Sequence, residues 1–194
     1  MLELGAIKKA IFVLIIIAVI AVGVVFLAAN NVDEKKEAEN VKAIFTKHDV
    51  DFESNDFLSD LGLLNNETLE SIKQELESSK KVLFFEKPEK ISGKIDILVG
   101  ITSLVIEVKK YDDLDSQILA GFTDPCGQIQ TAKERNNAEE NIIQLTETLI
   151  QQINEYSTKF GEGLEVELPQ DIANLKEKNQ AHKDGIIELE ALCK

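Results

Sequence analysis

Residues 93–110 read GKIDILVGITSLVIEVKK, and this stretch carries the strongest structural signal in the chain. Eight of the fourteen residues 95–108 are β-branched, which favours extended strands. We therefore predict two antiparallel strands, 94–99 and 104–109, joined by a tight turn at residues 101–102. A helical interpretation stays open, because Asp96, Ser103, Glu107 and Lys110 would form a polar stripe along a helix.

The two faces of the predicted hairpin differ in character. Side chains alternate along a strand, so one face is apolar while the other carries Asp96, Glu107 and Lys109. Asp96 would lie opposite Glu107, with their Cβ atoms about 4.5–5.5 Å apart. Two carboxylates at that separation can share Mg²⁺ or Mn²⁺, and Lys109 would position the attacking water or stabilise developing charge. These are the parts of a metal-dependent phosphodiester hydrolase.

The flanking segments complete a mixed pattern. Asn65 and the following Asn66 would cap a helix over residues 65–80, and residues 82–85 form a short β-prone run. A second helix is predicted over 127–160 and is stopped by Gly161 and Gly163; residues 164–168 alternate like a strand. A final helix starts at Pro169. The predicted order is helix, three strands, helix, strand, helix, which is a mixed α/β fold.

The Asp96 of IDILV followed by VIEVK resembles the PD-(D/E)xK nuclease superfamily, which has the restriction-endonuclease-like fold. That resemblance implies a core of helix, three strands, helix and strand over residues 65–168. It implies that Asp96, Glu107 and Lys109 are catalytic, with Asp96 and Glu107 holding the metal. Glu70 or Glu75 on the first helix would be a further metal ligand, and Gln128 (or Gln130) would assist. The sequence departs from the common pattern because no Pro precedes Asp96 and no clear Tyr follows the Gln.

The distribution of charge is uneven. The formal net charge of −14 argues against a generic nucleic-acid binder, which depends on many Lys and Arg contacts to phosphate. Residues 80–110 nevertheless carry seven Lys against four acids, a net charge of +3. A basic patch around a small metal site is what a DNA or RNA backbone requires, so nucleic acid is the expected substrate.

The N-terminal region predicts a membrane anchor. After a tail of residues 1–9, residues 10–29 are uncharged and long enough to cross a bilayer. More Lys residues follow this segment than precede it, which predicts a single-pass membrane protein whose domain faces the cytoplasm. Residues 30–64 are interpreted as a stalk and an acidic loop, 65–168 as the nuclease-like domain and 169–194 as the C-terminal helix.

A second interpretation, from a different class, is a non-catalytic interaction or scaffold domain, anchored and facing outward. In that setting Cys126 and Cys193 would form a disulfide and Asn66 would be a glycan acceptor. The final helix has polar Asn179 and His182 inside its apolar seam. That seam is therefore also a candidate face for a protein partner or an oligomer.

Overall fold

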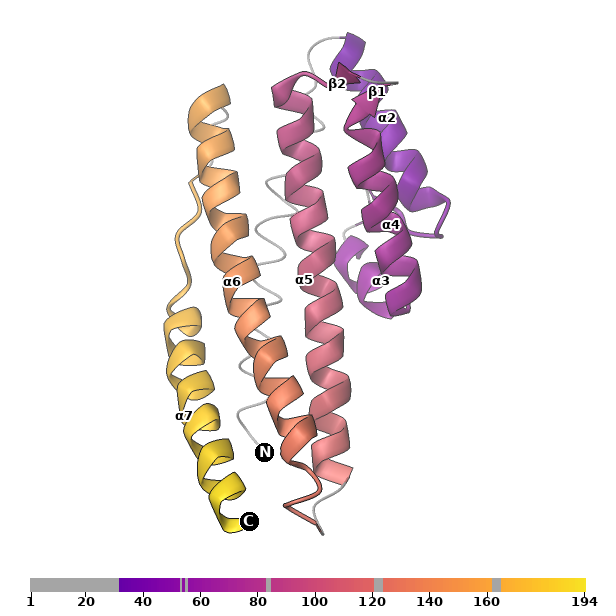
Figure 1. Ribbon diagram of the computed structural model, residues 1–194. Helices are drawn as coiled ribbons and strands as arrows, with labels where there is room; N and C mark the ends of the chain where they lie inside the picture. Colours follow the sequence, from indigo (N-terminus) through magenta and orange to yellow (C-terminus); the bar gives the residue numbers. More distant parts are fainter. Residues whose placement is uncertain (1–31, 53, 55, 83–84, 121–123, 162–164) are drawn as a thin grey trace.

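The computed structural model describes residues 32–194 except 53, 55, 83–84, 121–123 and 162–164 (Figure 1). Within these residues the chain forms helices and one short hairpin of two-residue strands. The elements in chain order are α2 (Val32–Thr46), α3 (Phe57–Leu63), α4 (Asn66–Ser79), β1 (Lys81–Val82), β2 (Phe85–Glu86), α5 (Glu89–Ala120), α6 (Ile129–Phe160) and α7 (Gln170–Leu192).

The long helices lie side by side in the order α4, α5, α6, α7 (Figure 1). α5 and α6 form an antiparallel pair and share the largest contact surface, while α2 packs on α4 and α3 packs on α5. β1 and β2 pair antiparallel between α4 and α5, with Lys81 opposite Glu86 and Val82 opposite Phe85. α5 therefore lies in the middle of the array and has neighbours on both sides.

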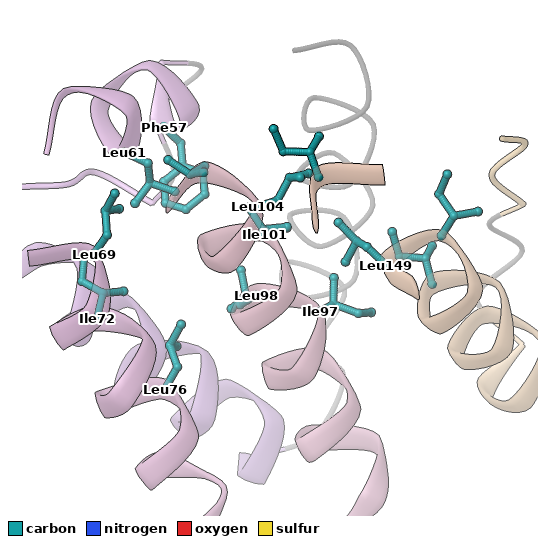
Figure 2. Close-up of a cluster of buried hydrophobic side chains, with 14 of the residues drawn as sticks. Phe57, Leu61, Leu69, Ile72, Leu76, Ile97, Leu98, Ile101, Leu104 and Leu149 are labelled. Atoms are coloured by element: carbon teal, nitrogen blue, oxygen red, sulfur yellow. The ribbon is translucent and has the colours of Figure 1, made fainter. Parts of the chain in front are cut away.

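The predicted α/β fold is wrong. The two strands expected at 94–99 and 104–109 are one continuous stretch of α5, and the described part of 164–168 is extended chain without a strand partner. α5 buries one set of side chains against α4 and α3 and another against α6. In Figure 2, Leu98 points toward α4 and Ile97 toward Leu149 of α6. A helix buried on two sides is apolar over much of its circumference, and α5 keeps only a narrow polar stripe that includes Asp96, Ser103 and Glu107. Its sequence therefore has a weak helical period, which does not separate it clearly from a strand.

Two glycines of α5 permit close packing against α6. A Cβ atom on Gly93 would lie 2.8 Å from Cδ2 of Tyr156, and one on Gly100 would lie 3.0 Å from Cδ1 of Leu149. Gly100, which the hairpin interpretation placed beside its turn, is therefore a helix-packing residue. The absence of a side chain brings the two longest helices together.

The predicted helix ends are confirmed. The side chain of Asn65 accepts a hydrogen bond of 2.8 Å from the backbone N–H of Thr68, so it caps α4. α6 ends at Phe160, and Gly161 follows it in the left-handed conformation with φ of 69°. Pro169 directly precedes α7. Asn65, Gly161 and Pro169 act on backbone groups close to them in the sequence, so these helix ends can be predicted without the tertiary structure.

The segment interpreted as stalk and acidic loop contains α2 and α3. Val41 and Phe45 of α2 are buried, and Phe45, Phe52 and Phe57 form a cluster with ring centroids 5.1–5.4 Å apart. Both helices thus contribute to the hydrophobic core on the α4 side of α5.

The structure does not support the predicted single-pass membrane location. The expected membrane helix, residues 10–29, lies outside the described residues. Of the helices between residues 32 and 194 that the structure describes, none combines the length and the apolar character needed to span a bilayer.

Candidate functional site

The predicted catalytic residues are not brought together. Asp96 and Glu107 both lie on α5, eleven residues apart, which is about three turns and roughly 16 Å along the axis. Lys109 turns to another side of the helix, where its Nζ donates a 2.8 Å hydrogen bond to the carbonyl of Gly62 near the end of α3. At that separation the two carboxylates cannot share one Mg²⁺ or Mn²⁺, whose oxygen ligands lie about 2 Å from the metal.

Asp96 and Glu107 instead have separate partners. Asp96 forms an ion pair with Lys80 at the end of α4. Glu107 Oε2 accepts a 3.2 Å hydrogen bond from Asn141 of α6 and lies 3.9 Å from Nζ of Lys110. In the described part of the chain, no group of three or more His, Cys, Asp or Glu residues is placed to hold a metal ion.

The two candidate glutamates of the first helix also lie apart. Glu75 Oε1 accepts hydrogen bonds from Lys47 at 2.9 Å and from Ser71 at 3.3 Å, and lies 3.0 Å from Nε2 of His48. The hydrogen bonds from Lys47 and then His48 lower the pKa of Glu75 below its ordinary value. Glu70 is half exposed and lies 3.8 Å from Lys73, one turn along α4.

The candidate glutamines lie at the start of α6, far along the chain from the α5 carboxylates. Gln128 immediately precedes α6, and its Oε1 is buried without a hydrogen-bond partner among the described residues. Gln130 Nε2 donates a 2.8 Å hydrogen bond to Glu134 one turn further on. Neither glutamine has a hydrogen bond to a carboxylate of the proposed nuclease site.

Two hollows lie along one face of α5, which packs between α4 and α6. The larger hollow has a volume of about 380 Å³ and is lined by residues of all three helices. Three charged side chains line this hollow: the predicted metal ligands Glu70 and Glu107, and Lys73 of α4. Hydroxyl, amide and aliphatic side chains complete it: Ser103, Ile106, Asn141, Gln144, Leu145 and Thr148.

A smaller hollow of about 250 Å³ lies further along the same face of α5, toward its N-terminus. It includes Asp96, which is eleven residues from Glu107 and therefore on the same side of the helix. Its lining is Glu89, Ser92, Gly93, Asp96, Gln152, Glu155, Tyr156, Lys159 and Phe160. We call the two hollows together the α5 groove. Three carboxylates predicted as metal ligands are thus divided between the two hollows, with Glu70 and Glu107 in the larger and Asp96 in the smaller, and they do not form one centre.

A disulfide joins Cys126 to Cys193, whose Cα atoms are 5.7 Å apart. Cys126 lies in the connection between α5 and α6, and Cys193 directly follows α7. The two cysteines are 67 residues apart in the sequence. The bond joins the end of α7 to the α5–α6 connection, which lies at the end of the array far from the β hairpin (Figure 1). The Cys126–Cys193 disulfide suggested by the interaction-domain interpretation is therefore present.

A buried polar cluster connects α5 and α6. Arg135 Nη1 of α6 lies 3.0 Å from Oδ1 of Asp115 of α5, and the two side chains are only 16% and 7% exposed. The Arg135 guanidinium also lies 5.9 Å from the ring centroid of Tyr111. Burial is the main cause that raises the pKa of Tyr111 to about 12, while the Arg135 charge acts in the opposite direction.

The cluster continues from α6 to α7. Asn179 of α7 donates to the backbone carbonyl of Asn136 at 3.0 Å and to Glu139 Oε2 at 3.3 Å. His182 Nδ1 lies 3.0 Å from the same Glu139 oxygen. The apolar seam of the last helix, with its two polar residues, therefore packs on α6 of its own chain. Asn179 and His182 are recognisable in the sequence as polar residues in an apolar seam, but their α6 partners are not, because partners 40 or more residues away leave no local pattern.

We predict that the folded protein resists ionisation of Tyr111 up to about pH 12. The unfolded pKa of 10.0 is lower, so between these values the unfolded chain loses its phenolic proton first, and stability falls as pH rises through this window. Phenolate absorbance of the variant Tyr156→Phe, in which Tyr111 is the remaining tyrosine, measures this directly. A midpoint near 10 in the folded variant would contradict the prediction; denaturant should move the midpoint to about that value.

Together these features define a helical array with a disulfide at one end, a polar groove along its central helix and a buried polar cluster between its last three helices. No protein-family model matches the chain, and no curated protein or solved structure matches it. The comparisons thus give no support to the resemblance to the PD-(D/E)xK superfamily.

Proposed function

We propose that this chain is a non-catalytic interaction domain that binds a basic helical segment of a partner polypeptide in the α5 groove. The observation that carries the proposal is the pair of hollows along one face of α5. At about 380 Å³, the larger hollow is within the range of roughly 300–1,000 Å³ typical of protein ligand sites.

The charge of the groove favours a basic partner. Five carboxylates and two lysines line the hollows: Glu70, Glu89, Asp96, Glu107, Glu155, Lys73 and Lys159. The adjacent Lys80 and Lys110 pair with Asp96 and Glu107, so five carboxylates against four lysines leave a net charge of −1. Complementary charge steers a partner to the site and selects against acidic segments.

The spacing of the hollows favours a helical partner. Asp96 and Glu107 are separated by eleven residues of α5, and a helix laid along the groove would present side chains with the same repeat. Lys or Arg residues at positions i and i+11 of the partner would then each reach one hollow, while Ile106 and Leu145 offer apolar contact between helices.

The test uses the full oxidised chain and two synthetic alanine-based helical peptides. One peptide carries Lys at i, i+4, i+7 and i+11, and the other carries Glu at those positions. Ser103→Trp fills the larger hollow, whereas Ser116→Trp places the same ring on an exposed position of α5 outside it. We expect the Lys peptide to bind the unmodified chain and Ser116→Trp equally, and at least tenfold more weakly to Ser103→Trp.

Equal binding to both tryptophan variants would show that the groove is not the binding surface. Equal binding of the Glu peptide would contradict the charge argument. Circular dichroism of each variant checks that the helices remain folded, so that a loss of binding reports on the groove.

A further inference from the structure

The two halves of α7 are attached very differently. The first half buries Ile172, Leu175 and Asn179 against the rest of the domain. From residue 180 to residue 194, all of which are described, no residue is buried, and Ile187 and Leu192 are 63% and 84% exposed. Apolar burial therefore holds the first half of the helix and contributes little to the second.

The second half contacts α6 through charged side chains. Glu190 lies 2.5 Å from Lys133 Nζ, and Lys183 lies 2.9 Å from Glu140. All four side chains are more than a third exposed, so water and salt screen these ion pairs and each contributes little. The disulfide of Cys193 is the covalent tie at the end of this half.

We propose that the Cys126–Cys193 disulfide is a redox-sensitive latch whose reduction releases residues 180–194 of α7 from α6 while α2–α6 remain folded. This inference concerns α7 and does not depend on the function proposed for the α5 groove.

Reduction of this disulfide requires a dithiol reductant. Cys126 is exposed, so such a reductant can reach it. A thiolate of the reductant attacks the Sγ atom of Cys126, the Cys126–Cys193 bond breaks, and Cys193 leaves as a thiolate that takes up a proton. The second thiol of the reductant then loses its proton and displaces Cys126, which leaves as a thiolate and is protonated in turn. The protein gains two thiols and the reductant becomes a disulfide, so two electrons and two protons are transferred.

Release would uncover a charged group on α6. Glu139 is 1% exposed beneath α7, where Asn179 and His182 contact its Oε2. Its Oε1 is buried without a hydrogen-bond partner among the described residues. Opening would give Oε1 access to water, which offsets part of the cost of breaking the contact between His182 and Oε2.

Hydrogen exchange of the full chain tests the latch in three forms: oxidised, reduced with dithiothreitol, and Cys126→Ser/Cys193→Ser. We expect amides of residues 180–192 to exchange at least tenfold faster in the second and third forms. Amides of α5 around Ile101 should keep their exchange rates, because α7 packs chiefly on α6 while this part of α5 lies in the core beside α4 and α6.

Unchanged exchange of residues 180–192 after reduction would overturn the proposal, since α7 would then be held without the disulfide. Equal loss of protection in α5 would also overturn it, because the disulfide would then support the whole domain. As a control, oxidised Lys133→Met removes the ion pair to Glu190 and leaves the disulfide intact. In this variant the exchange rates of residues 180–192 should change less than threefold. A tenfold change would show that the ion pair, and not the disulfide, holds this part of α7.

Discussion

The variant Ile101→Ala is expected to lose about 2–5 kcal/mol of its free energy of unfolding, the usual range for truncating a fully buried Ile. Ile101 is 0% exposed in the middle of α5, where it lies with Leu98 and Leu104 in the core between α5 and its neighbours (Figure 2). Removing the side chain forfeits its transfer free energy and leaves a cavity that helices on both sides cannot fully close.

Urea denaturation of Ile101→Ala and Ile187→Ala makes the comparison with a matched control. Ile187 is 63% exposed on α7, so the same truncation there should change stability by no more than about 0.5 kcal/mol. The measurement also separates the two folds considered for this segment. In a hairpin, Ile101 would be in a surface turn, and its truncation would cost as little as that of Ile187.

The variant Arg135→Met should destabilise the domain by about 3–5 kcal/mol, because it leaves the carboxylate of Asp115 buried without its cation. The two side chains are 3.0 Å apart and largely buried between α5 and α6. In such a pair the remaining charge, rather than the lost attraction, is the main source of the cost.

The double variant Arg135→Met/Asp115→Leu provides the decisive control. It removes both charges, so most of the lost stability should return in thermal or urea denaturation. The variant Lys176→Met removes an ion pair whose partners, Lys176 and Glu147, are 49% and 39% exposed, and should cost less than about 1 kcal/mol. If Arg135→Met were as mild as Lys176→Met, the buried cluster would not be a stabilising contact between these helices.

The candidate site was predictable only in part. The sequence predicts Asp96 and Glu107 as metal ligands with Glu70 or Glu75 as a further one; Asp96, Glu107 and Glu70 line the α5 groove, and Glu75 does not. Their assembly around a metal depended on the hairpin, and the continuous helix separates Asp96 from Glu107 by about three turns. The roles of Asp115 and Arg135 were missed, because a buried ion pair between two helices has no short-range sequence motif.

Local sequence signals are enough to place the ends of several helices. Asn65, Gly161 and Pro169 act on backbone groups within a few residues, so their effect does not depend on distant partners. The helix predicted over residues 127–160 could also be recognised from the sequence, because α6 has one polar face and one apolar face.

The helical conformation of residues 89–120 depends on contacts with other helices. Their β-branched side chains favour strands locally, but burial between α4 and α6 favours a helix that fills both interfaces at once. The energy of packing two faces of α5 exceeds a strand preference that amounts to about 1 kcal/mol at most per residue. Because that packing comes from helices on both sides, the residues of this segment could not reveal it alone.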